Sequence, residues 1–206
     1  MSLYEKYVLP KFLNCACGSR PVERQRKKVV PLAGGKVLEI GIGSGLNIPF
    51  YDKSKIVEVW GLDPSDALSE MAKKVALNES LEINFISSGA EEIPLPDNHF
   101  DTVLITYTMC TIPEVLRAND EIRRVLKSEG KMIFCEHGVA PDENIRKWQN
   151  RINPYWGMLA GGCNINRNIP SLIEDSGFDI VELEEMYLPK TPKIAGYNYW
   201  GYAVVK

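Results

Sequence analysis

The chain has 206 residues, of which 45% are hydrophobic and 25% charged, with a formal net charge of −3. This is the composition of an ordinary globular protein, and it excludes a disordered or fibrous chain and disfavours nucleic acid as a partner, so a small-molecule substrate is expected. No apolar run reaches the roughly 18 residues of a transmembrane segment and no signal peptide is recognisable, so we expect a cytoplasmic protein with reduced cysteines.

The opening segment, residues 1–35, is expected to form an N-terminal helical extension to a single domain over residues 36–206. Its basic residues are Lys6, Lys11, Arg20, Arg24, Arg26, Lys27 and Lys28. Two interpretations stay open: a solvated face, which we favour, or weak contact with an acidic membrane surface. Cys15 and Cys17 have Cys-x-Cys spacing without a matching second pair, so no metal site is expected.

Short apolar runs alternate with amphipathic segments from Lys36 onward. The pattern predicts strands at Lys36–Ile40, Val57–Leu62, Ile83–Ser87, Thr102–Tyr107 and Lys131–Glu136. It predicts helices at Ala67–Asn78, Pro113–Lys127 and Asn168–Ser176. Alternation of this kind indicates an α/β fold, with a mostly parallel central sheet and helices on both faces. The final runs, Phe178–Met186 and Asn198–Val205, have no helix between them and predict a C-terminal antiparallel strand pair.

Residues 140–164, between the fifth strand and the last helix, form a connection too long to be tight. The segment is rich in aromatic residues, including Trp148, Tyr155 and Trp156. We interpret it as a lid-like insertion over the site, although aromatic residues at helical spacing usually pack in a core.

A glycine turn follows the first strand, with Gly41, Gly43 and Gly45 and then an expected helix. Glycines let a ligand approach the backbone, and ligands of parallel sheets bind at the carboxyl ends of strands. A dinucleotide fingerprint would require glycine at position 46, which is Leu46, so a pyrophosphate ligand and a nicotinamide oxidoreductase are disfavoured.

Two carboxylates accompany this turn. Glu39 precedes it and could hold an ammonium group directly or through ordered contacts. Asp63 ends the second strand, where an acidic side chain can accept both hydroxyls of a ribose. The glycine turn and both carboxylates together favour a cationic nucleoside ligand.

These features resemble the class I S-adenosylmethionine-dependent methyltransferases, from about Val37 to Gly138. The segments Gly89–Asp101 and Arg123–Lys127 agree with that family in order. The resemblance implies a Rossmann-like fold, S-adenosylmethionine as cofactor and S-adenosylhomocysteine as product. By position it implies a cofactor site made of Glu39, Gly41, Gly43, Gly45, Asn47, Asp63, Pro64, Gly89, Ala90, Glu91 and Thr106. Many members have aspartate where this chain has Gly89, so backbone groups of Gly89 and Ala90 would contact adenine.

Within the class, the chain is similar to a group of small thiol methyltransferases and to bacterial phospholipid amine methyltransferases. Cys110, the pair Glu136-His137, the pair Trp148-Gln149 and the segment Gly162-Cys163-Asn164 carry the first likeness, whereas Gly45–Tyr51 carries the second. The implied substrate pocket consists of Tyr7, Tyr107, Cys110, Trp148, Cys163 and Asn164.

Methyl transfer from a sulfonium is an in-line displacement, so the enzyme chiefly positions a nucleophile and excludes water. A thiol acceptor reacts as the thiolate, and His137 is the candidate base, with Glu136 as a second catalytic candidate. The alternative is a packing histidine bonded to a backbone carbonyl. Three functions stay open: a thiol methyltransferase, which is favoured, an amine or phospholipid head-group methyltransferase, or a non-catalytic cofactor-binding module.

Overall fold

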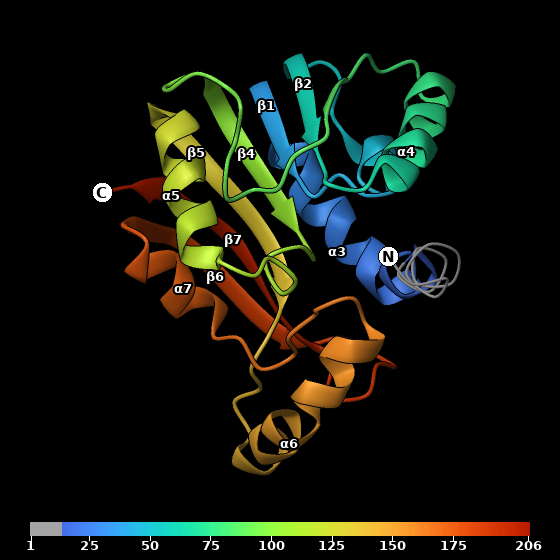
Figure 1. Cartoon of the computed structure of the whole chain (residues 1–206), viewed down its shortest axis with the longest axis vertical. Helices are drawn as coiled ribbons and strands as arrows, with labels where there is room; N and C mark the ends of the chain where they lie inside the picture. The colour runs from blue at the N-terminus through green and yellow to red at the C-terminus, as the bar shows by residue number, and fades with distance from the viewer. Residues whose placement is uncertain (1–13) are drawn as a thin grey trace.

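A computed structural model describes residues 14–206, and its centre is one seven-stranded sheet in the order β3-β2-β1-β4-β5-β7-β6 (Figure 1). The strands are β1 Gly35–Ile40, β2 Ile56–Leu62, β3 Asn84–Ile86, β4 Phe100–Thr106, β5 Leu126–His137, β6 Phe178–Tyr187 and β7 Tyr197–Val205. The five neighbouring strands β3, β2, β1, β4 and β5 pair in parallel, and β7 is antiparallel to both β5 and β6. The predicted parallel sheet and C-terminal antiparallel pair are therefore confirmed.

Helices cover both faces of the sheet (Figure 1). They are α3 Arg20–Val29, α4 Asp66–Asn78, α5 Val115–Val125, α6 Glu143–Leu159 and α7 Ile169–Asp175, with 3₁₀ turns η1 Val30–Leu32 and η2 Ile48–Phe50. The Ser65 side chain caps α4 by accepting from the amide of Leu68, and Asn168 caps α7 in the same way. These caps set where both helices begin.

Two apolar layers hold the helices to the sheet. Val29 and Val30 are fully buried against one face, together with Val37, Leu104 and Ile133. The other face is larger and packs against α5 and α7 through residues that include Phe100, Val103, Ile122, Ile173 and Phe178. The central strands β4 and β5 are thus buried on both sides, as the almost continuous apolar runs of parallel strands predict.

The structure differs from the sequence-based expectation in two connections. The glycine turn leads into the 3₁₀ turn η2 rather than the expected helix. Strand β5 begins at Leu126, five residues early, because Leu126 pairs with Phe100 although the residues after it are polar.

The N-terminal segment is part of the folded body from α3 onward. Arg24, Lys27 and Lys28 are exposed as expected, but Arg26 is only 5% exposed, so the prediction of a solvated basic face is wrong for this residue. Its position on the helix explains the burial, since Val29 and Val30 lie three and four residues later on the same face. Of the expected N-terminal helical extension, residues 1–13, which include Tyr7, lie outside the described residues.

The insertion at 140–164 consists mainly of α6, which lies beyond the carboxyl ends of β4 and β5 (Figure 1). Gln149 is fully buried: it accepts from the amide of Ala140 at 2.9 Å and donates to the carbonyl of Ile165 at 2.8 Å. The helix is therefore attached by a polar side chain. Within residues 14–206, no helix is both long and apolar enough to cross a membrane.

Candidate active site

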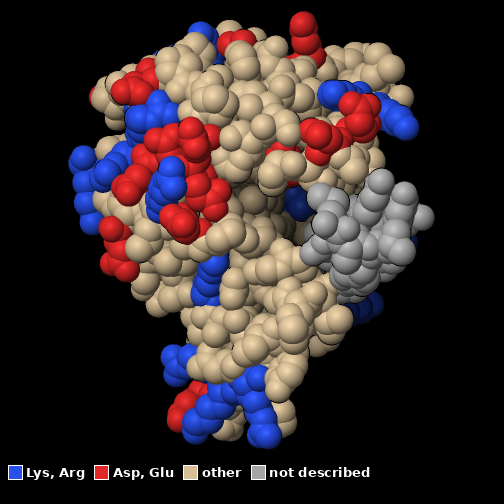
Figure 2. Space-filling view, in the orientation of Figure 1, with Lys and Arg blue, Asp and Glu red and all other residues tan. Residues whose placement is uncertain are grey.

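A cavity of about 390 Å³ opens at the carboxyl ends of β1, β2 and β4. In Figure 2 a recess is visible in the middle of the face shown. Residues lining the cavity include Arg26, Gly41, Gly43, Asp63, Pro64, Gly89, Ala90, Glu91, Thr106, Tyr107, Thr108, Thr111 and Gly161. Of the predicted cofactor residues, Glu39, Gly45 and Asn47 are not on this wall.

The backbone of the glycine turn forms the floor beside β1. Gly41 has φ +69°, and its amide donates to the carbonyl of Leu62 at 2.7 Å. A Cβ at Gly41 would lie 2.3 Å from the Thr108 side chain, whereas a Cβ at Gly43 would meet nothing closer than 3.8 Å. Glycine at position 41 is therefore required both by the backbone conformation and by the turn after β4.

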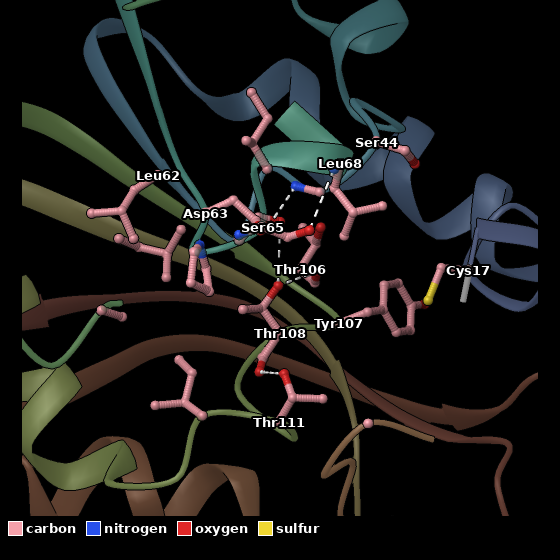
Figure 3. Close-up of a pocket in the computed structure, with 18 of the residues that line it drawn as sticks. Cys17, Ser44, Leu62, Asp63, Ser65, Leu68, Thr106, Tyr107, Thr108 and Thr111 are labelled. Carbon is pink, nitrogen blue, oxygen red and sulfur yellow. Dashed lines mark hydrogen bonds between the residues drawn. The ribbon is translucent and has the colours of Figure 1, made fainter. Parts of the chain in front are cut away.

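Asp63 projects into the cavity from the end of β2 (Figure 3). Its Oδ2 accepts from the amide of Gly43 at 2.9 Å, and its Oδ1 accepts from the amide of Ser65 at 2.8 Å. Burial raises the pKa of Asp63, while the two backbone hydrogen bonds oppose that shift. Each carboxylate oxygen has two acceptor positions, so both can still receive a hydroxyl.

Glu39 lies behind the cavity wall and is 1% exposed. It accepts from Asn47 Nδ2 at 2.9 Å and from the Tyr51 hydroxyl at 2.7 Å. Burial raises the pKa of Glu39 to about 7, against the lowering effect of the hydrogen bond from Tyr51. In this structure Glu39 orders the turn after β1, and it does not present its carboxylate to the cavity as expected.

Arg26 is a cavity residue that the sequence analysis missed. One terminal nitrogen, Nη1, donates to Asn47 Oδ1 at 2.6 Å and to Thr106 Oγ1 at 2.7 Å. The guanidinium lies 5.1 Å from the centre of the Tyr107 ring. Its Nε is buried without an acceptor among the described residues. A cation on the cavity wall suits a ligand carboxylate. The sequence signal for its burial was the helix face that it shares with Val29 and Val30.

Glu136 and His137 end β5 and point to different partners, as neighbouring strand residues do. Glu136 is fully buried and accepts from the amides of Thr108 and Met109 at 2.8 and 3.0 Å, so it fixes the turn after β4. Burial raises the pKa of Glu136 to about 7. His137 Nε2 lies 3.3 Å from Cys163 Sγ and is not on the cavity wall.

Cys110, His137 and Cys163 form a cluster next to the cavity. The neighbouring Cys110 thiol lowers the pKa of Cys163, with burial opposing and His137 assisting. Asn164 joins the segments, since its amide and its side chain both donate to the Cys110 carbonyl, at 2.9 and 3.1 Å. The cavity is lined by Thr111, which follows Cys110, and by Gly161, which precedes Cys163 by two positions in the sequence.

Of the two remaining predicted pocket residues, one lines the cavity and the other does not. Tyr107 lines the cavity from a positive φ of 53° directly after β4. Trp148 does not: it is 56% exposed on α6, because its neighbour Gln149 occupies the inward position of that helix. Trp148 is therefore not among the residues that line this cavity.

Together, the fold and the cavity define an α/β protein that presents a nucleoside-sized site at the switch point of its sheet. The residues fit S-adenosylmethionine: Asp63 suits a ribose, the glycine turn admits a close ligand, and Arg26 places a cation on the wall for a carboxylate. A family model described as "Methyltransferase domain" matches residues 38–134.

Curated proteins support the same class. Thiol S-methyltransferase TMT1B of Homo sapiens is 30% identical over 175 residues, covering 80% of this chain and 71% of the relative. Thiol S-methyltransferase TMT1A of Homo sapiens is 28% identical, covering 82% and 70%. A phosphatidylethanolamine N-methyltransferase of Cereibacter sphaeroides is 32% identical over 136 residues, covering 65% and 66%.

Solved structures agree on the fold. A putative methyltransferase from Bacillus halodurans has a TM-score of 0.69 at 14% identity, covering 89% of this chain and 96% of that one. A possible histamine N-methyltransferase from Thermotoga maritima has a TM-score of 0.68 at 18% identity, covering 98% of both. The chain belongs to the class I S-adenosylmethionine-dependent methyltransferases, and it has their Rossmann-like fold.

Proposed function

We propose that this methyltransferase transfers the methyl group of S-adenosylmethionine to the sulfur of a small thiol. The observation that carries the proposal is the extent of the likeness to the thiol S-methyltransferases, which covers 80–82% of the chain. This share of the chain is larger than the segment matched by the family model, residues 38–134. The likeness therefore includes parts of the chain outside the cofactor strands, where acceptor specificity is expected to reside.

We assign the cofactor contacts as follows. Asp63 accepts the ribose hydroxyls, and Gly89 and Ala90 contact the adenine through their backbone. Arg26 donates to the methionine carboxylate from the cavity wall. Glu39 and Asn47 act as positioning residues, because they hold the turn and Arg26 from behind the wall.

When bound, S-adenosylmethionine supplies an electrophilic methyl carbon, whose bond to the sulfonium breaks as its bond to the acceptor sulfur forms. The thiol proton must leave before or during this step, because the thiolate is the nucleophile. The cavity wall includes the aromatic ring of Tyr107, which gives an apolar acceptor a surface to pack against.

A second candidate is N-methylation of a phospholipid head group. It is favoured by the 32% identity to the phosphatidylethanolamine N-methyltransferase, although that likeness covers only 65% of the chain. An enzyme with this function would need a membrane contact beside the cavity. The non-catalytic binding module is a third candidate, and it predicts binding of the cofactor without turnover.

The test is a labelled-methyl assay with purified protein and three acceptors: butanethiol, butylamine, and vesicles that contain phosphatidylethanolamine. The proposal expects label in methyl butyl sulfide and none in the other two products. Label in the lipid only would favour the head-group function, and binding without label in any product would favour the binding module. Asp63→Ala protein is the matched control, because it should lose transfer to every acceptor alike.

A further inference from the structure

The donor atoms of Cys110, His137 and Cys163 all lie within 4.8 Å of one another. They come from three separate segments: the turn after β4, the end of β5 and the loop after α6. Cys110 is 2% exposed and Cys163 is 7% exposed, and His137 is partly buried. None of the three residues is among the proposed cofactor contacts, and Glu136 accepts its hydrogen bonds from other residues, Thr108 and Met109.

The three donor atoms are close enough together to surround one zinc ion. Zinc binds thiolate sulfur at about 2.3 Å and imidazole nitrogen at about 2.0–2.1 Å, which places ligand atoms about 3.5–3.8 Å from one another. His137 Nε2 and Cys163 Sγ are already 3.3 Å apart. Small side-chain rotations would be enough to bring all three donors around one ion.

The chemistry of the donors points to the same kind of ion. Two thiolates and one neutral imidazole are soft ligands that select zinc over magnesium or calcium. The charge also balances, because two thiolates neutralise one Zn²⁺ ion in a buried position where an isolated charge would be costly. Asn164 fixes the Cys163 loop beside Cys110, because its backbone amide and its side chain both donate to the Cys110 carbonyl. Neither bond uses a donor atom of the cluster.

We propose that Cys110, His137 and Cys163 bind a zinc ion whose fourth coordination position takes the sulfur of the acceptor. Three protein ligands and one exchangeable position are typical of catalytic zinc, whereas structural zinc has four protein ligands. The described residues supply three donors to the cluster. Thr111 and Gly161, close to two of the ligands in sequence, line the cavity, so the open position would be adjacent to it.

The consequence for the reaction concerns the acceptor proton. A thiol that binds zinc loses its proton to solvent, because a coordinating thiol is deprotonated by the ion. His137 would then be a ligand rather than a base. The methylated sulfur is a neutral thioether and a weaker ligand, so the product can leave. This part of the inference rests on the proposed thiol acceptor, but binding of the ion does not.

The first experiment measures the metal content of the purified chain by elemental analysis. The protein is first dialysed in the presence of a reductant. We expect one zinc ion per chain. Cys110→Ser and Cys163→Ser should each weaken zinc binding by more than about a hundredfold, while Cys15→Ser, at an exposed cysteine, should leave it unchanged. Circular dichroism would show that the variants are folded. Absence of zinc, or its retention in both variants, would overturn the site.

A second experiment needs no substitution and tests the open position. Cobalt(II) is titrated into metal-free wild-type protein, and the thiolate-to-cobalt absorption bands report binding. Butanethiol should shift these bands and butylamine should not; bands that butanethiol leaves unchanged would reject acceptor coordination. Full-rate methylation of butanethiol by metal-free protein would overturn the zinc inference and leave the proposed function standing. Zinc binding with transfer to butylamine alone would do the opposite.

Discussion

Arg26 Nη1 lies 2.6 Å from Asn47 Oδ1, so a basic residue of the N-terminal helix is bonded to the segment that follows the glycine turn. Asn47 in turn donates to Glu39 and Thr106, at 2.9 and 3.0 Å. A buried polar network of this kind connects α3, β1 and β4 behind the cavity. Because its members share partners, removal of one affects the positions of the others.

Replacement of Arg26 by methionine should therefore reduce both stability and cofactor affinity. Methionine retains much of the volume but leaves Asn47 Oδ1 without its donor, which costs about 1–3 kcal/mol of unfolding free energy. S-adenosylmethionine affinity should fall about tenfold or more, measured by calorimetry. The exposed Arg24→Met is the control on the same helix. Equal affinities of the two variants would reject the role assigned to Arg26.

Asp63→Ala should weaken S-adenosylmethionine binding about tenfold or more, because it removes charge-assisted hydrogen bonds to the ribose of about 1.5–3 kcal/mol each. The same change frees the amides of Gly43 and Ser65. Calorimetry on protein whose fold is checked by circular dichroism gives the comparison. An unchanged dissociation constant would mean that Asp63 serves only the turn.

Gly41→Ala should destabilise the protein more than Gly43→Ala. Both residues have positive φ, +69° and +54°, so both substitutions carry a backbone cost of about 1–2 kcal/mol. At position 41 the new methyl group would also meet Thr108 at 2.3 Å. Urea unfolding of both variants measures the difference. If Gly43→Ala is the less stable of the two, the close approach of Thr108 to the turn is not rigid.

Glu39 should make stability fall as the pH rises from about 5 to 7. Its folded pKa is about 7 against an ordinary value of 4.5. In this window the folded state retains a proton that the unfolded state has lost, so unfolding becomes easier with rising pH. The full effect is about 3 kcal/mol at most.

The measurement is urea unfolding across this pH range for wild type and Glu39→Gln. Glutamine cannot ionise, so the variant should have a flatter profile, and the difference between the two profiles isolates Glu39. Glu136 has a similarly raised pKa, but it is present in both proteins and cancels. Parallel profiles would show that Glu39 is already ionised in the folded protein.

The cavity wall at the ends of β1 and β2 was largely predictable, because its signals are local in sequence. Gly41 and Gly43 are set by the tight turn after a buried strand, and Asp63 by the end of the next strand. Gly89 to Glu91 follow from the order of the family motifs. Each of these residues needs only its own strand and turn to be recognised, and the parallel sheet brings their ends together.

The cluster of Cys110, His137 and Cys163 and the burial of Arg26 could not be predicted in the same way. Cys110 and Cys163 are 53 residues apart in number and meet only because the loop after α6 folds back onto the turn after β4. Arg26 was misjudged since its charge suggested solvent, whereas its helix face determined its burial. Trp148 points outward because its neighbour Gln149 takes the inward position on α6. There the Gln149 amide donates to the buried carbonyls of Gly138 and Ile165.

The placement of β7 between β5 and β6 bears on how the chain is made. Strand β7 is the last element, Tyr197–Val205, yet it is the partner of β5 from Lys131 to His137. Until it emerges, a growing chain exposes the apolar edge of β5, and an open strand edge is a template for aggregation. A truncation before residue 197 should therefore yield insoluble protein, even though every proposed cofactor contact precedes it. Strand β7 thus fills the place between two strands, β5 and β6, that are synthesised before it.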